Sequence, residues 1–174
     1  MPRPDDELLA GLAAGREDAF RAAYERFAPR LLAVACGILG TRDEAEDAVQ
    51  DLFLSLVKSR PTLGRVENLS AYLFASLRHA AARRIARQRI MPQATDPARP
   101  PEWRAPAKSE IPAERSARLE QALASLPPEQ REVIALKVDG GLTFHEIAAV
   151  LGTSPNTAAS RYRYALEKLR ERMT

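Results

Sequence analysis

The sequence predicts an all-α protein with two small helical domains joined by a Pro-rich linker, the C-terminal domain being a helix-turn-helix. Three observations lead to this prediction. The chain is rich in Ala, Leu, Arg and Glu, and aromatic residues make up only 6% of its 174 residues, a mixture that favours helices over sheets. Apolar residues recur at helical spacings on both sides of the middle of the chain. Six prolines between Met91 and Pro112 exclude a regular helix there.

The prolines divide the chain into three predicted parts. Residues 1–90 form the first domain, residues 91–113 the linker and residues 114–174 the second domain. Each flanking part is near the lower size limit for independent folding. An extended, semi-stiff linker is one interpretation of the proline-rich part. An irregular loop that packs on one domain through Trp103 is the alternative.

Composition excludes several classes of protein. The single cysteine, Cys36, excludes an intramolecular disulfide and a cysteine-based zinc site, and we expect neither a metal nor a cofactor. Without a signal peptide or an apolar run of ~18 residues, the chain is expected to be cytoplasmic and to have no membrane partner. His79 and His145 are its only histidines, no nucleophile stands beside a base, and no phosphate-binding glycine loop occurs. We therefore do not expect an enzyme.

The first domain contains helical patterns only. The predicted helices cover about Asp5–Phe27 (with a potential break near Gly15), Pro29–Leu39, a segment from Thr41 to Arg60-Pro61, and about Asn68–Ile90. Pro29 suits a first helical turn. Thr41 and Glu44 have the spacing of a capping box, in which each side chain bonds to the other residue's backbone N–H.

The helix that starts at Thr41 has an acidic face. Glu46, Asp47, Gln50 and Asp51 lie at spacings of three and four, and so share one side. A solvated face is one interpretation of this pattern, and a docking surface for a basic partner is the other.

The last helix of the first domain has the opposite character. Arg78, Arg83, Arg84, Arg87 and Arg89 occur there, with no acidic residue between Asn68 and Thr95. Arginines without a counter-charge repel one another unless an anion lies beside them. DNA phosphate is the natural candidate, and RNA is a weaker one because no RNA-binding signature occurs. A solubilising basic face remains the alternative.

The second domain ends in a pair of helices with strong boundary signals. Preceding helices are predicted at Glu114–Ala124 and from Pro128, with Val133, Ile134, Leu136 and Val138 as core residues. Thr143 and Glu146 form a second capping box pattern. Gly152 suits the left-handed turn after a short helix, and Ser154 is a strong N-cap for the next. A short turn with a glycine is typical of a helix-turn-helix.

The last helix would present polar residues to DNA. Asn156, Ala159, Ser160 and Arg163 share its outward face. In a helix-turn-helix the N-terminal part of this helix enters the major groove, where Asn suits adenine and Arg suits guanine. Arg161 and Lys168 could reach phosphates. An ordinary helical hairpin is the alternative.

Three segments together resemble a bacterial sigma factor of the sigma-70 family, in its extracytoplasmic-function (ECF) class. AEDAVQDLFLSL (Ala45–Leu56) is similar to the family's polymerase-docking helix, and SAYLFASLRHAAARRIARQR (Ser70–Arg89) to its minus-ten segment. Residues Leu123–Arg170 are similar to its minus-thirty-five domain. The resemblance implies a transcription initiation factor that binds core RNA polymerase, directs it to specific promoters and assists DNA opening. Its implied partners are core RNA polymerase, double-stranded and melted promoter DNA, and an anti-sigma factor.

The resemblance also assigns residues to each surface. Polymerase binding falls to Asp47, Gln50, Asp51 and Leu54. Minus-ten DNA binding falls to Tyr72, Arg78, His79, Arg83, Arg84 and Arg87. Minus-thirty-five binding falls to Ser154, Asn156, Thr157, Ala159, Ser160, Arg161 and Arg163. An unstacked base would be held by Tyr72, Phe74 and the loop at residues 61–68.

The chain departs from the family pattern at several positions. Tyr72 stands where the family often has Trp, and His79 where it often has Asn. Ala158 replaces a usual Val, and Tyr162-Arg163-Tyr164 partly replaces a basic Arg-Ala-Arg. Two other functions stay open: a stand-alone helix-turn-helix regulator, and a sigma-like interaction protein that sequesters an anti-sigma factor.

Overall fold

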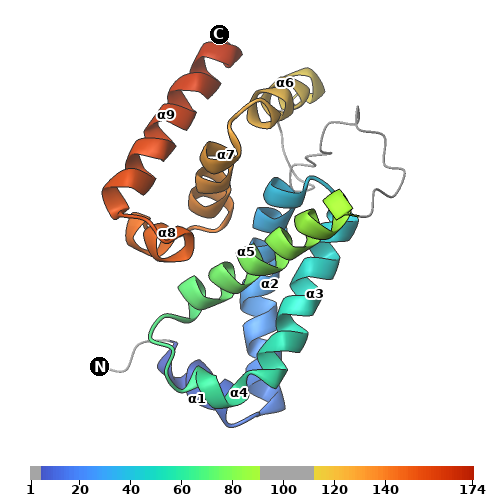
Figure 1. Ribbon diagram of the computed structural model, residues 1–174, viewed down its shortest axis with the longest axis vertical. Helices are drawn as coiled ribbons and strands as arrows, with labels where there is room; N and C mark the ends of the chain where they lie inside the picture. The colour runs from blue at the N-terminus through green and yellow to red at the C-terminus, as the bar shows by residue number, and fades with distance from the viewer. Residues whose placement is uncertain (1–4, 91–111) are drawn as a thin grey trace.

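The computed structural model describes residues 5–90 and 112–174, and within these residues every regular element is helical. The all-α prediction is confirmed. The predicted linker, apart from its last two residues, and its Trp103 lie outside the described residues. Figure 1 shows α1 and α4 at one end of the molecule, and α6 and the end of α9 at the other. Helices α2, α3 and α5 lie between them, with α7 and α8 beside α2 and α5.

The first two helices differ from their predicted boundaries. Helix α1 spans Asp6–Ala13 and α2 spans Glu17–Leu39. Gly15 separates them with a φ of 73°, in the left-handed region that favours glycine. The predicted helix start at Pro29 is wrong, because α2 runs through it. A proline removes one backbone hydrogen bond, but Phe27 and Leu31 beside it are fully buried, and their packing keeps the helix continuous.

Helices α3 (Arg42–Lys58), α4 (Arg60–Leu63) and α5 (Leu69–Ile90) complete the first half. The capping box predicted at Thr41 is wrong, since the Thr41 side chain makes no cap hydrogen bond. The Glu44 carboxylate instead accepts a hydrogen bond from the Gln88 amide of α5. Glu44 thus bonds to Gln88 of α5 instead of to the backbone at Thr41.

The second half begins with α6 (Ala113–Ala124), α7 (Pro128–Ile134) and the π-helical turn η1 (Ala135–Asp139). Val133, Ile134 and Leu136 are buried as predicted, but Val138 is 62% exposed. The prediction for Val138 is wrong because it assumed α-helical spacing. A π-turn bonds residues five apart and so shifts the later side chains around the helix axis.

Helices α8 (Phe144–Leu151) and α9 (Pro155–Met173) follow the predicted boundary signals. Thr143 and Glu146 form the capping box in full, and Gly152 ends α8 with a φ of 65°. The Ser154 side chain accepts a hydrogen bond from the backbone N–H of Thr157. Ala148 of α8 and Ala158 of α9 are buried, and Ala165 packs in a second cluster with Leu123, Leu126 and Ile134.

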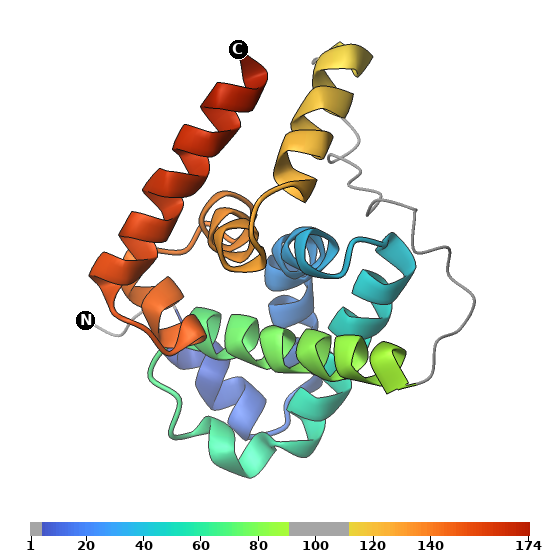
Figure 2. The ribbon, with the colours of Figure 1, turned by 45° about the horizontal axis from the view of Figure 1, so that its top comes forward.

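The two halves of the chain pack against each other. One continuous hydrophobic core includes Leu73 and Leu77 from α5 together with Ile147 and Val150 from α8. Helix α5 packs on α8, and α2 packs on α7 and η1. Figure 2 shows the start of α5 beside α8, whereas its other end extends away from the second half.

Candidate nucleic-acid interface

The acidic face of α3 points to solvent. The side chains of Asp47 and Asp51 are 63% and 54% exposed to solvent. Gln50 is exposed, and Leu54 is 57% exposed although it is apolar. Acids around an uncovered leucine are suited to a partner that brings basic groups and a small apolar surface. The structure therefore brings all four predicted docking residues onto one accessible surface.

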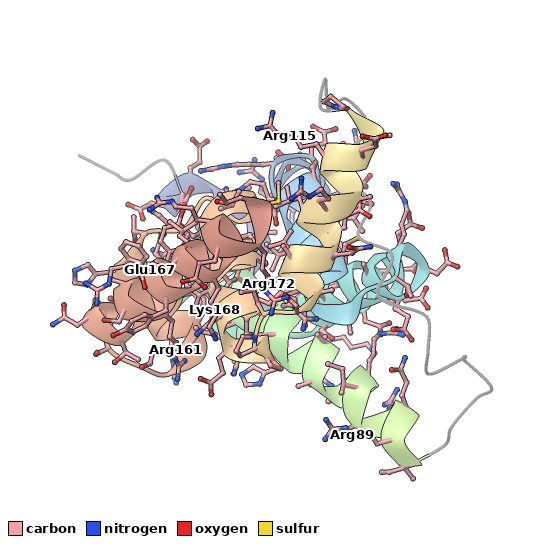
Figure 3. The ribbon with its side chains drawn as sticks, turned by 90° about the horizontal axis from the view of Figure 1, so that it is seen from above. Arg89, Arg115, Arg161, Glu167, Lys168 and Arg172 are labelled. Atoms are coloured by element: carbon pink, nitrogen blue, oxygen red, sulfur yellow. The ribbon has the colours of Figure 1, made fainter. Side chains whose placement is uncertain are left out.

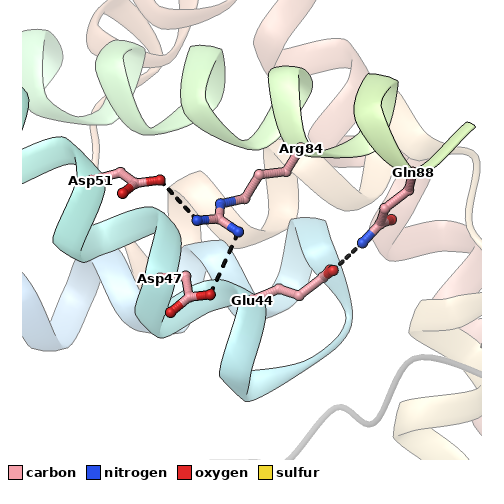
Figure 4. A network of polar contacts seen from close by, with 5 residues as sticks. All are labelled: Glu44, Asp47, Asp51, Arg84 and Gln88. Atoms are coloured by element: carbon pink, nitrogen blue, oxygen red, sulfur yellow. Dashed lines mark hydrogen bonds and ion pairs between the residues drawn. The ribbon is translucent and has the colours of Figure 1, made fainter. Parts of the chain in front are cut away.

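Arg84 of α5 connects this acidic face to the arginine-rich helix. Its guanidinium lies 2.8 Å from the Asp51 carboxylate and 3.6 Å from that of Asp47. Figure 4 shows Arg84 between the two aspartates, with the Gln88–Glu44 contact one turn further along α5. The sequence assigned Asp51 and Arg84 to different partners, but here they are partners of each other.

The arginines of α5 are not all without a counter-charge, contrary to the prediction. The Nε atom of Arg78 lies 2.7 Å from the Glu132 carboxylate of α7, and Arg84 meets the acids of α3. These acids are distant in sequence, so the local charge pattern could not show them. Arg83 and Arg87 are exposed, and the structure gives them no ion pair within residues 5–90 and 112–174.

The other residues predicted to bind the minus-ten element differ in accessibility. Tyr72 is half-buried and His79 is exposed. Phe74 is only 1% exposed, and the Arg30 guanidinium covers its ring at 5.6 Å. The prediction that Phe74 lines a pocket for an unstacked base is therefore wrong, because its ring is part of the core.

Helix α9, which is predicted to read DNA, has both exposed and half-buried residues on its predicted DNA-facing side. Asn156 and Arg163 are exposed, and Ala159 and Ser160 are half-buried. The Ser154 and Thr157 hydroxyls lie 2.9 Å apart and share a hydrogen bond at the helix start. These two side chains therefore already serve the N-cap, whereas Asn156 and Arg163 remain available to a ligand.

Two cations of α9 have local partners. Arg161 lies 3.1 Å from the Glu129 carboxylate of α7, and the Arg163 guanidinium lies over the Tyr164 ring at 5.3 Å. Figure 3 shows Arg161 and Lys168 on α9, well separated from Arg89 at the far end of α5. The cations of α9 and those at the far end of α5 thus belong to two different surfaces.

One basic residue was missed by the sequence prediction. Lys58, the last residue of α3, lines a groove between α3 and α5 together with Arg83, Arg84 and Arg87. Lys58 follows Asp51 by seven residues, which places both on one side of α3. This spacing was the available signal, but the basic partners come from another helix.

Titratable groups near the contact between the two halves are perturbed. Burial raises the pKa of Asp139 from 3.8 to about 6. Burial also acts to raise the pKa of Glu146, but hydrogen bonds from Thr143 and Asn68 outweigh it and lower that pKa. Burial raises the pKa of the Cys36 thiol, which makes it a poor nucleophile.

The described part of the chain has neither a metal-binding cluster nor a membrane-spanning helix. Among residues 5–90 and 112–174, no three His, Cys, Asp or Glu side chains are grouped so as to hold a metal ion. No helix in the same residues combines the length and apolar character needed to cross a bilayer.

Comparisons with known proteins agree on one family. Residues 23–90 match the model for Sigma-70 region 2, and residues 116–169 match that for Sigma-70, region 4. The chain is 31% identical to the RNA polymerase sigma factor CarQ of Myxococcus xanthus over 159 residues, 90% of each protein. It is 32% identical to the ECF RNA polymerase sigma factor SigL of Mycobacterium tuberculosis over 165 residues, 93% of each.

Solved structures show the same fold. The sigma factor RpoE of Bartonella quintana, solved in complex with the anti-sigma factor NepR, superposes with a TM-score of 0.73. It is 25% identical, over 88% of this chain and 96% of that one. CnrH, in complex with the cytosolic domain of CnrY, gives a TM-score of 0.68 at 24% identity over 96% and 95% of the two chains. The protein belongs to the ECF class of the sigma-70 family of RNA polymerase sigma factors.

Proposed function

We propose that this protein binds core RNA polymerase, directs it to specific promoters and assists the opening of promoter DNA. One observation carries the proposal: the same chain presents an exposed acidic face on α3 and a helix-turn-helix with an exposed recognition helix. A stand-alone regulator needs the second feature but not the first. The family of the chain and the names of its relatives support the same function.

The proposed division of labour follows the surfaces. Asp47, Gln50, Asp51 and Leu54 bind the polymerase. The minus-ten element is met by Tyr72, His79 and the arginines of α5. Asn156, Ala159, Ser160 and Arg163 read the minus-thirty-five element, while Ser154 and Thr157 act by fixing the start of α9. Residues 1–90 and 114–174 act as two promoter-binding units, with residues 91–113 as the connection.

Initiation from a matched promoter tests this function. Purified core polymerase with this protein is expected to start transcripts at promoters that share two spaced upstream boxes. Mapping transcript starts after overexpression supplies these promoters. Tight binding to bare palindromic DNA, without initiation, would instead favour a stand-alone regulator.

Charge reversal tests the docking surface. Asp47→Arg and Asp51→Arg are each expected to reduce binding to core polymerase by about tenfold or more, because truncating or reversing one charge of a tightly packed interfacial pair costs several kcal/mol. Affinity is measured with labelled protein and core polymerase. Glu17→Arg is the matched control, since Glu17 is an exposed acid on α2 and is not part of the acidic face of α3. Equal losses in all three variants would contradict the assignment.

An anti-sigma factor is a further proposed partner. The relative solved with NepR is a sigma factor bound by such a protein. In the present structure α8 covers the start of α5 and Glu132 holds Arg78. Glu132 therefore competes with promoter phosphates for Arg78, and a partner that holds the two halves together would oppose initiation.

A further inference from the structure

A groove runs between α3 and α5 on the first half of the molecule. Its volume is about 200 Å³. Four cations line it, one from α3 and three from α5: Lys58, Arg83, Arg84 and Arg87. Asp51, Leu54, Ser55 and Ala80 complete the lining, so that Asp51 is its one acid among the described residues.

The charges of the groove do not balance. Arg84 is neutralised by Asp51 and Asp47, but Lys58, Arg83 and Arg87 have no ion pair with any residue in the described ranges. Three like charges on one concave surface repel each other, and their repulsion is relieved when an anion binds between them. The groove is thus built for an anion.

We propose that this groove binds a phosphodiester of the DNA backbone, and that Asp51 takes the place of that phosphate on Arg84 when the groove is empty. The choice of DNA rests on the proposed function, whereas the anion site rests on the groove itself. Arginine donates pairs of hydrogen bonds to phosphate oxygens, and lysine adds a mobile point charge. Lys58 of the docking helix is therefore a DNA ligand.

Arg84 is the residue that changes partner. The Arg84–Asp51 pair is partly exposed, with 24% and 54% of the two side chains accessible, so exchange of one anion for another costs little. The Arg84 Nε atom is shielded from water and has no hydrogen-bond partner among the described residues. Movement of the guanidinium towards a phosphate would give this donor a partner.

The exchange connects the groove to the docking surface. Asp47 and Asp51 belong to the proposed polymerase-binding face, so basic groups of a bound partner compete with Arg84 for them. Binding there releases Arg84 to the phosphate. By thermodynamic linkage, phosphate in the groove also frees the two aspartates for the basic partner. Binding of DNA and binding of polymerase thus each increase the affinity for the other through Arg84.

The first test measures phosphate contacts without polymerase. A short single-stranded oligonucleotide of mixed sequence is titrated with the full chain by fluorescence anisotropy at several salt concentrations. Lys58→Gln is expected to make the slope of log K against log salt shallower by about 0.7, the value for one lost phosphate contact on a single strand. Arg115→Gln, on α6 and distant from the groove, is expected to leave the slope unchanged. Equal slopes for the two variants would overturn the proposal.

The second test uses the acid that occupies Arg84. Asp51→Asn is expected to raise affinity for the same oligonucleotide by about two- to fivefold, the range for loss of one exposed ion pair. Glu46→Gln removes the same charge from α3, but Glu46 pairs with Arg42 and does not line the groove. A gain no larger for Asp51→Asn than for Glu46→Gln would show only a general charge effect and would overturn the proposal.

Two further outcomes identify the ligand and separate the two proposals. Millimolar inorganic phosphate, at constant ionic strength, is expected to compete weakly with the oligonucleotide; equally strong competition would indicate a site for free phosphate rather than for DNA. Promoter-specific initiation is scored independently. If both groove tests succeed but no initiation occurs, only the proposed function is contradicted. If initiation occurs but the groove variants bind the oligonucleotide as the unaltered protein does, only the groove proposal is contradicted.

Discussion

At the scale of the residue, Gly152 and Gly64 can be compared directly because they differ in backbone conformation but not in available space. A Cβ at either position would meet nothing within 4 Å, but Gly152 has a φ of 65° and Gly64 a φ of −63°. Gly152→Ala is therefore expected to lower the free energy of unfolding by about 1 kcal/mol through backbone strain alone. Gly64→Ala is expected to raise it by about 0.4–1 kcal/mol. Urea unfolding measures both, and changes of the same sign would contradict the backbone explanation.

Asp139 gives a prediction about pH. Its pKa is raised from 3.8 to about 6 by burial, so between these values the folded protein holds a proton that the unfolded chain has lost. Its contribution to stability is therefore largest below pH 4 and is lost as pH rises to about 6. Asp139→Asn is expected to remove this decline, measured as the free energy of unfolding at several pH values. An unchanged decline in the variant would assign it to other groups.

The structural role of a residue was predictable where that role depends only on neighbouring residues in the chain. Ser154, Thr143 and Gly152 act on their own backbone neighbourhood, and all three adopt the predicted roles. Phe74 and Val138 were assigned wrongly because a local pattern shows neither contacts with other elements nor a π-turn. Arg30 covers Phe74, and the π-turn directs Val138 outward.

At the scale of the element, two similar sequence patterns have different structures. Thr143 and Thr41 both precede a helix and have a Glu three residues later, but only Thr143 makes the capping hydrogen bonds. Thr143→Ala is expected to cost about 1 kcal/mol of stability, and Thr41→Ala much less. Thermal unfolding of the two variants measures the difference. Equal destabilisation would mean that Thr41 also caps its helix in solution.

Helix existence was easier to predict than helix extent. The apolar stripe of α3 and the boundary signals of α8 and α9 gave the correct elements. Pro29 was interpreted as a helix start, because a proline inside a helix is locally unfavourable. The burial of Phe27 and Leu31 decides otherwise, and such tertiary packing cannot be derived from a local pattern.

At the scale of the whole molecule, a double-mutant cycle tests how the halves are arranged. Arg78→Met and Glu132→Gln, alone and together, are expected to show a coupling energy of about 1 kcal/mol, since this pair joins α5 to α7 and is partly buried. Urea unfolding measures the cycle. Arg161→Met with Glu129→Gln is the control, because that pair lies within the second half. Coupling in the control but not in Arg78–Glu132 would mean that the halves are apart in solution.

The contact between the halves was beyond sequence-based prediction. The prolines were interpreted as a division between two sets of helical patterns, and the apolar stripes of α5 and α8 as the cores of separate domains. In the structure the same stripes contribute to one core. An apolar stripe shows that a face is buried but does not identify what covers it.

The shared core also bears on the order in which the protein is made. Residues 5–90 leave the ribosome before α7, η1 and α8 exist, so the faces of α2 and α5 that these elements cover are at first exposed to water. At about 5–20 residues per second, synthesis of the remaining chain takes several seconds. During that interval the nascent first half presents an uncovered apolar surface to chaperones and to other nascent chains.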